Sequence, residues 1–292
     1  MQLETIDHIV IAVEDVAKAR EPLERLGLPL TPLMTHGGGA TTNSAFFAGN
    51  EGTEFYVELL GIADPAAAAT TQSGAALAKR LETGGGTHGL AFTATDAAAV
   101  RGALAGLPGG FTEDAPARDD GTPIATVFRP ADPTVLGVPF TVIVYAEPLA
   151  TRRARHRDAG LFANPLGIRR MDHLAAIVHH PDDVVAAWDR VFGVPVFGEV
   201  RTPAMVIRQV KVGDAILELL SPATPDSGIY QRPEGLAAMA AFEVADIQAA
   251  VVHARACGFT VADPGPGPLP GTHTSTIPAA ELGFGLQLLQ YV

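Results

Sequence analysis

The sequence predicts an α+β protein built from four βαβββ units, called modules 1 to 4 below, that pair into curled mixed sheets. One observation is an internal repeat: Ile6–Leu30 and Met171–Val196 both run from Asp-His through an apolar stretch, an acidic turn and a helical segment to Gly-apolar-Pro-apolar. A second is that Phe55–Leu60 recurs as Ala215–Leu220. Because one such module leaves a sheet edge unpaired, joining two modules covers that edge and forms a cup.

Module 1 shows the predicted element order most clearly. Alternating β-branched residues at Thr5–Val13 predict the first strand, and Asp15 is placed to cap the following helix. The later elements predicted are a helix over Val16–Leu26 that stops at Gly27, strands at Leu28–Leu33, Ser44–Ala48 and Glu54–Leu60, a turn at 49–52, and a connecting helix over Ala66–Leu81.

Modules 2 to 4 follow the same pattern. Module 2 begins with a strand at His88–Asp96 and module 3 covers Met171–Leu220, while module 4 begins with a strand at Met239–Asp246. The other predicted elements are a helix over Ala97–Ala105 and strands at Arg118–Pro130 and Phe140–Tyr145 in module 2, and a helix over Ile247–Ala256 and a strand at Gly285–Gln290 in module 4.

The length and composition fit two domains. The chain has 292 residues, of which 47% are hydrophobic, so each half can bury a core. We expect a first domain at 1–147, a linker at 148–170 and a second domain at 171–292. The linker holds a basic run at 152–157, which we expect to be a solvated surface; an anion-binding patch is the alternative.

Charge and cysteine content restrict the partners. A formal net charge of −12 argues against a nucleic-acid partner. The single cysteine excludes an intramolecular disulfide and favours a reducing compartment. The chain begins with no signal-peptide pattern and has no apolar run long enough for a membrane span. We therefore expect a cytoplasmic monomer or homodimer that acts on a small molecule.

A histidine and a glutamate recur in step in the two halves. His8 and Glu58 lie on the first and last predicted strands of module 1, and His173 and Glu218 lie on those of module 3. A lone histidine is often only a satisfied core residue. A glutamate inside an apolar strand fits that interpretation poorly, because an unpaired buried charge costs several kcal/mol. The recurrence therefore predicts ligands, or remnants of ligands, for a divalent ion such as Zn, Ni, Co, Mn or Fe.

Both halves resemble the vicinal oxygen chelate superfamily, which includes glyoxalase I, methylmalonyl-CoA epimerase, extradiol dioxygenases and bleomycin- or fosfomycin-resistance proteins. The first half is similar to glyoxalase-like domains, and the second is more similar to methylmalonyl-CoA epimerase. The residues that carry the resemblance are Asp7–Val13, His36, Asn43 and Tyr56–Leu60 in the first half, and Lys211–Pro222, Asp226-Ser227 and Phe242–Ile247 in the second.

The resemblance implies one metal ligand on the first strand and one on the last strand of each module. Modules 1 and 3 keep both, as His8 with Glu58 and His173 with Glu218. The other modules depart from the pattern: in module 2 Gly89 replaces the histidine, with His88 one residue early, and Ile143 replaces the glutamate, whereas module 4 has Met239 and Gln287.

Two arrangements of the modules remain open at this point. If neighbouring modules pair, which is the more usual topology, each cup has only two good ligands, supplemented by His88 or Gln287. If module 1 pairs with module 3, one cup gathers His8, Glu58, His173 and Glu218, which is the His2Glu2 set of metal-dependent glyoxalases.

The resemblance implies a lyase or isomerase of the glyoxalase or epimerase type that acts on vicinal oxygens through a metal-stabilised enediolate. Glu58 and Glu218 would be its catalytic proton carriers. A metal-free small-molecule binding or resistance protein and an extradiol-type dioxygenase are the alternatives. The candidate substrate contacts are His36, Asn43, His88, His273 and Gln287.

Overall fold

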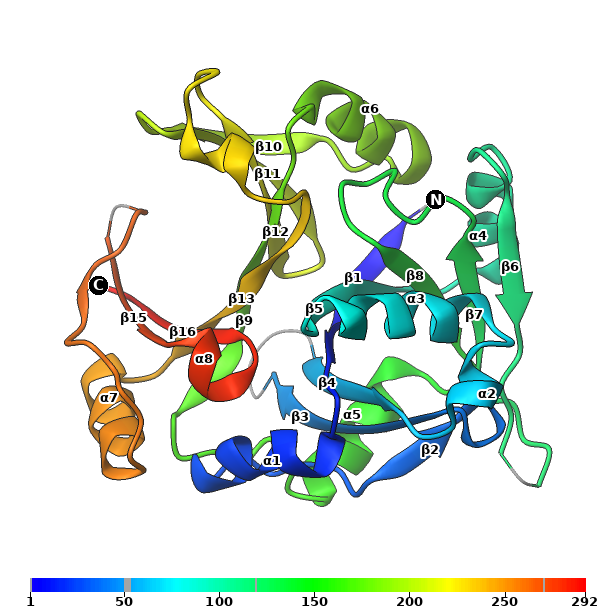
Figure 1. Cartoon of the computed structure of the whole chain (residues 1–292), viewed down its shortest axis with the longest axis horizontal. Helices are drawn as coiled ribbons and strands as arrows, with labels where there is room; N and C mark the ends of the chain where they lie inside the picture. Colours follow the sequence, from blue (N-terminus) through cyan, green and yellow to red (C-terminus); the bar gives the residue numbers. More distant parts are fainter. Residues whose placement is uncertain (1, 50–53, 119, 270) are drawn as a thin grey trace. The chain divides into compact units, whose positions relative to one another are not determined.

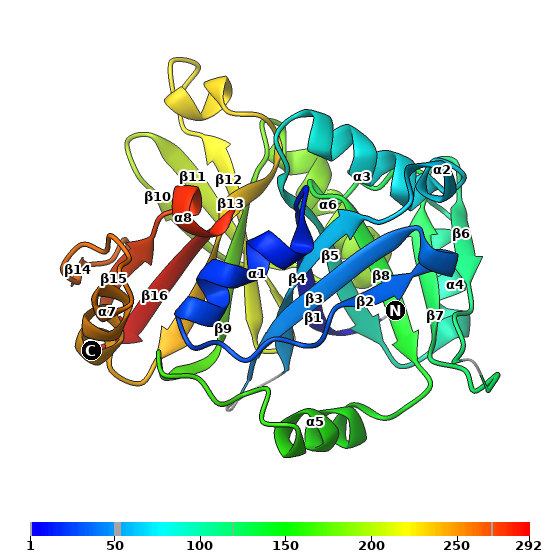
Figure 2. The same cartoon turned by 60° about the horizontal axis from the view of Figure 1, so that its bottom comes forward.

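The computed structural model describes residues 2–49, 54–118, 120–269 and 271–292, and its strands form two eight-stranded mixed sheets (Figures 1 and 2). The strands of the first half are β1 (Leu3–Ala12), β2 (Met34–His36), β3 (Thr41–Ala48), β4 (Phe55–Ile62), β5 (Gly86–Ala94), β6 (Phe111–Asp114), β7 (Ala125–Pro130) and β8 (Phe140–Tyr145). The strands of the second half are β9 (Ile168–Ile177), β10 (Val196–Arg201), β11 (Met205–Val212), β12 (Ala215–Pro222), β13 (Gly235–Val244), β14 (Gly265–Pro266), β15 (Thr272–Ile277) and β16 (Gly285–Tyr291).

Helices connect these strands. Helix α1 packs on β3 and β4 (Figure 2), and α7 packs on β15 and β16. The helices are α1 (Val16–Arg25), α2 (Pro65–Ala68), α3 (Gln72–Glu82), α4 (Ala97–Leu104), α5 (Leu149–Asp158), α6 (Pro181–Phe192), α7 (Ile247–Ala256) and α8 (Ala279–Leu282), with short 3-10 turns at Gly37–Gly39 and Gly228–Gln231.

The two sheets have the same strand order. The first is β2-β3-β4-β1-β5-β8-β7-β6 and the second is β10-β11-β12-β9-β13-β16-β15-β14. Each sheet therefore joins neighbouring modules, 1 with 2 and 3 with 4. Pairing of module 1 with module 3 is wrong, and each sheet carries one of the two His–Glu pairs.

The chain also divides into two compact units, whose limits differ from those of the sheets. One unit contains 1–7, 89–155 and 173–237, and its core includes Trp188 packed against Phe92 and Phe192. The other unit contains 8–88, 156–172 and 238–292, and its core includes Phe46 packed against Phe242 and Phe284. Modules 2 and 3 thus supply most of one core, and modules 1 and 4 supply most of the other.

Several elements agree with the sequence prediction. Helix α1 begins after Asp15, whose carboxylate accepts a hydrogen bond from the Lys18 amide at 3.1 Å. Strand β8 and helix α7 have the predicted bounds. The predicted turn at 49–52 lies outside the described residues except for Gly49.

Other predictions need correction. The segment Leu28–Leu33 forms only an isolated bridge at Leu30, and the strand follows at β2. The helix predicted over Ala66–Leu81 is two helices, because Thr71 caps α3 through the Gly74 amide at 3.0 Å. Strand β6 was not predicted, and the strand predicted over Arg118–Pro130 is confined to β7.

The Asp15 cap supplies a first test. Asp15→Ala removes the acceptor for the Lys18 amide and is expected to lower the free energy of unfolding by about 1 kcal/mol. The measurement is the urea unfolding midpoint, with Glu14→Ala at the exposed neighbouring position as control. An equal shift in both variants would show that the cap contributes nothing specific.

Candidate functional site

His8 and Glu58 face each other on neighbouring parallel strands. In the register of β1 and β4, His8 lies opposite Tyr56 and Glu58 lies opposite Val10. His8 and Glu58 are therefore two positions apart on the same face of the sheet. Both side chains are buried, and His8 Nε2 lies 3.6 Å from Glu58 Oε2.

Two neighbours hold this pair in place. Asn43 on β3 donates a hydrogen bond from Nδ2 to Glu58 Oε1 at 2.6 Å, which offsets part of the cost of burying the carboxylate. The Tyr56 ring stacks on the His8 ring, with centroids 4.3 Å apart. With Oε1 engaged by the amide, the other carboxylate oxygen is the one that faces His8.

His173 and Glu218 repeat this arrangement in module 3. In the register of β9 and β12, His173 lies opposite Ile216 and Glu218 lies opposite Ala175, so the two buried side chains again share one face. Gln209 lies directly opposite Glu218 on β11 and donates from Nε2 to Glu218 Oε1 at 2.9 Å. The sequence analysis did not identify Gln209 as a site residue. The pattern that could have identified it is an amide side chain on the strand next to Glu218, at a position that alternation places on the same face.

Each pair would offer a divalent ion two protein ligands. One imidazole nitrogen and one carboxylate oxygen are both common ligands of Zn, Ni, Co, Mn and Fe. Within the described part of the chain no group of three or more His, Cys, Asp or Glu side chains could hold a metal. Each pair would therefore leave most coordination positions to water or to substrate oxygens.

Two other candidate residues of the first half are histidines on strands β2 and β5. His36 is exposed on β2 at the edge of its sheet. His88 is half-buried on β5, and its pKa is lowered by burial first and by the nearby Arg80 charge second. Because Gly89 holds the histidine register, His88 projects from the opposite strand face.

The two candidate residues of module 4 lie on neighbouring antiparallel strands. Gln287 on β16 is half-buried and lies opposite Thr276 of β15. His273 on β15 is half-buried and lies opposite Gln290. Both are placed in the sheet as strand residues, and their contact with a substrate stays a prediction.

An aspartate–tyrosine pair adjoins each site histidine. Asp7 and Asp172 immediately precede the two histidines, and both are buried. Asp7 accepts a hydrogen bond from the Tyr145 hydroxyl at 2.9 Å, and Asp172 accepts one from the Tyr291 hydroxyl at 2.9 Å. Each tyrosine lies at the end of the last strand of its half. The sequence showed the repeated Asp-His but not its partners, which lie more than a hundred residues away.

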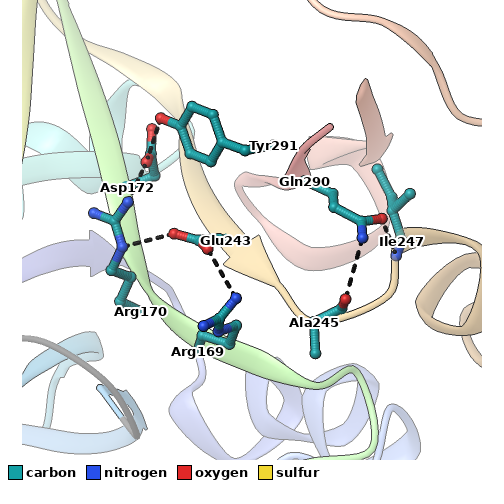
Figure 3. Close-up of polar contacts among 8 residues, drawn as sticks. All are labelled: Arg169, Arg170, Asp172, Glu243, Ala245, Ile247, Gln290 and Tyr291. Carbon is teal, nitrogen blue, oxygen red and sulfur yellow. Dashed lines mark hydrogen bonds and ion pairs between the residues drawn. The ribbon is translucent and has the colours of Figure 1, made fainter. Parts of the chain in front are cut away.

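An arginine lies beside the aspartate of each aspartate–tyrosine pair. Arg152 on α5 is 6% exposed, lies 3.8 Å from Asp7 and places its guanidinium carbon 3.4 Å from the Tyr145 ring centroid. This residue corrects the expectation of a wholly solvated basic linker. In the second half Arg170 lies 3.2 Å from Asp172 and 2.7 Å from Glu243 (Figure 3).

The contact between Asp172 and Tyr291 predicts an observable titration of the tyrosine. Burial, then the Asp172 charge and its hydrogen bond, raise the pKa of Tyr291 from an ordinary value of 10.0 to about 12. Because the pKa of Tyr291 is raised in the folded state, the contact stabilises the fold fully below pH 10. This stabilisation is lost as the pH rises through about 12. In ultraviolet titration, the difference between wild type and Tyr291→Phe should show this midpoint, and Asp172→Asn should lower it. An unchanged midpoint in Asp172→Asn would contradict the assignment.

Family comparisons agree with the fold and with the repeat. A model described as a glyoxalase-like domain matches residues 6–192, and one described as the glyoxalase/bleomycin resistance protein/dioxygenase superfamily matches residues 172–275. No curated protein matches the sequence.

Two solved structures share the architecture over nearly the whole chain. A hypothetical protein from Staphylococcus aureus is 11% identical with a TM-score of 0.65, covering 99% of this chain and 100% of that chain. A mutant of 4-hydroxymandelate synthase from Streptomyces coelicolor is 16% identical with a TM-score of 0.67, covering 100% of this chain and 93% of that chain. A variant of methylmalonyl-CoA epimerase from Streptomyces coelicolor is 23% identical with a TM-score of 0.38, and its match covers 43% of this chain and 96% of that chain. With the repeated fold and the match over most of its length, this chain belongs to the glyoxalase-like domain family of the vicinal oxygen chelate superfamily.

Proposed function

We propose that this protein is a metal-dependent lyase or isomerase of the glyoxalase or epimerase type, acting on a small substrate with two adjacent oxygens. The observation that carries the proposal is the repeated cluster of a buried histidine, a buried glutamate and an amide that hydrogen-bonds the glutamate. A buried carboxylate is costly unless it is paired, and its recurrence beside a histidine in both halves favours a ligand role over core packing.

The protein residues have distinct tasks in this proposal. His8 with Glu58, and His173 with Glu218, would each hold one divalent ion, which supplies Lewis-acid polarisation of the substrate oxygens. Asn43 and Gln209 restrain one oxygen of each glutamate, so that the other oxygen has a fixed direction. The glutamate carboxylates are also the groups that can accept a proton from a carbon next to the substrate oxygens and return it.

Solvent-proton exchange tests this proposal. Protein stripped with a chelator and then supplied with Zn, Ni, Co, Mn or Fe is incubated in deuterated water with small 2-hydroxy carbonyl compounds, hemithioacetals and 2-substituted acyl thioesters. We expect deuterium to enter the carbon next to the substrate oxygens only in the metal-supplied protein. Glu58→Gln and Glu218→Gln identify the half that carries the proton. Failure of every metal with every substrate would contradict the proposal.

The amides give a matched pair of variants. Gln209→Leu leaves Glu218 Oε1 without its donor and is expected to weaken metal binding at the second pair by about 10–100-fold. Asn43→Leu should do the same at the first pair alone. Calorimetric titration of the stripped protein measures both. Equal weakening at both pairs in either variant would show a general loss of structure instead.

A metal-free binding protein is the second candidate. It is favoured by the small number of protein ligands, since the described residues offer no group of three or more. An iron dioxygenase is less well supported. Its site needs two histidines and one carboxylate, whereas each pair offers only one histidine and one carboxylate. Whichever activity holds, we propose a small-molecule ligand and a cytoplasmic location. As a separate observation, none of the described helices is long and apolar enough to cross a membrane.

A further inference from the structure

A segment of the chain's own linker lies against the face of the sheet that carries Glu58. In the register of β3 and β4, Ala45 lies opposite Glu58 and Phe47 lies opposite Tyr56, so these four side chains project from one face. Phe162 packs against Ala45 and Phe47 in a buried apolar cluster, with Leu161 and Tyr56 at its margin. The linker therefore reaches the neighbours of both site residues.

Aromatic contacts connect this segment to the site histidine. The His8 ring stacks on Tyr56, and the Tyr56 ring lies 5.0 Å from Phe47 between centroids. Phe47 in turn contacts Phe162 edge-on at 6.1 Å and His156 at 4.5 Å. Phe162 is only 3% exposed. Such ring pairs contribute beyond their buried area, so the segment is packed firmly on residues that neighbour the site.

Local structure directs the chain to this position. After α5, Gly160 adopts a φ of 74°, and the Leu161 amide bonds to the His156 carbonyl at 3.0 Å while the Gly160 amide bonds to the Arg157 carbonyl at 2.9 Å. This is a Schellman ending, which reverses the chain. His156 Nδ1 also lies 3.1 Å from both carboxylate oxygens of the buried Glu54. One end of the segment is thus fixed by a polar contact and the other by aromatic packing.

The two His–Glu pairs differ at the position where the segment packs. Ala45 lies opposite Glu58, and its small side chain leaves room for the Phe162 ring. Gln209 lies opposite Glu218 at the corresponding place, and its amide is engaged with that carboxylate. The repeat has therefore diverged at the residue that accepts the linker.

We propose that residues 156–162 form a built-in cover over the His8–Glu58 pair, so that a ligand reaches this pair only when the cover moves away. The inference rests on the proposed function insofar as the pair is a ligand site. It makes the two pairs unequal: access to His8 and Glu58 depends on the contacts of Phe162 and His156, and access to His173 and Glu218 does not.

Histidine acylation by diethyl pyrocarbonate, followed by mass spectrometry of peptides, tests the cover in chelator-treated protein. We expect slow modification of His8 in the wild type and a rate several-fold higher in Phe162→Ala. Phe162→Leu, which keeps most of the apolar volume, should remain near the wild type. His173 and the exposed His36 are internal controls whose rates should not change. Because no metal is present, a positive result stands even if the lyase or isomerase proposal fails.

Contrary results are equally specific. An unchanged His8 rate in Phe162→Ala would overturn the proposal, and so would parallel increases at His8 and His173, which would indicate loosening of the whole fold. If Phe162→Ala does not fold, His156→Gln supplies the test, since it keeps a hydrogen-bond donor near Glu54 but removes the imidazole that packs on Phe47. A His8 rate unchanged in this folded variant would also overturn the cover.

Discussion

Asp7→Ala is expected to destabilise the protein by about 3–5 kcal/mol, because it leaves a buried guanidinium without its carboxylate. Arg152 is 6% exposed and lies 3.8 Å from Asp7, and the Tyr145 hydroxyl donates to the same carboxylate at 2.9 Å. The variant removes the acceptor of the Tyr145 hydroxyl and the negative charge that faces Arg152. The measurement is the free energy of unfolding in urea, followed by circular dichroism.

The equivalent residue of the second half provides the control. Asp172→Ala should cost less, since the Arg170 side chain is 27% exposed and keeps Glu243 at 2.7 Å. Asp7→Asn should be intermediate, because an amide oxygen can still accept from Tyr145 but carries no charge for Arg152. A loss below about 1 kcal/mol in Asp7→Ala, within the range of an ordinary surface change, would contradict the account of this cluster.

Trp188→Ala is expected to cost about 3–5 kcal/mol by leaving a large cavity in one compact unit. The Trp188 side chain is fully buried and meets Phe92 edge-on with centroids 5.6 Å apart. Its indole nitrogen donates to the Leu136 carbonyl at 3.2 Å, so the variant also removes a hydrogen bond from a buried carbonyl.

Phe197→Ala is the matched control for the tryptophan variant. Phe197 is 54% exposed, and its truncation should change the free energy of unfolding by no more than about 0.5 kcal/mol. Equal losses in the two variants would mean that the core around Trp188 contributes less than its burial indicates.

Local patterns were enough to predict much of the fold. Helix α1 was predicted from Asp15 and the residues after it, and α7 has its predicted bounds directly after its cap at Asp246. The strand predicted over Leu28–Leu33 failed because Pro29 and Pro32 each lack an amide donor for a ladder. The helix expected over Ala66–Leu81 breaks where Gly74 approaches the Ala68 carbonyl so closely that an added Cβ would lie 2.2 Å from its oxygen.

The candidate site could be predicted only in part. The sequence predicted that His8 and Glu58 face each other because strand alternation and the repeat determine both positions. The pairing of modules could not be decided in this way, because every module offers the same kind of edge; the sheet order resolves it. The Asp7–Tyr145 pair and the Phe162 contacts depend on residues far apart in the chain, for which no local pattern exists.

The amount of divalent metal bound to protein purified without chelator tests the central claim most directly. If each His–Glu pair holds its own ion, His8→Ala and His173→Ala should each remove only the metal of their own half, and the double variant should retain none. An intact fold that carries no metal in the wild type, or metal that survives the double variant, would contradict the claim and leave only the architecture.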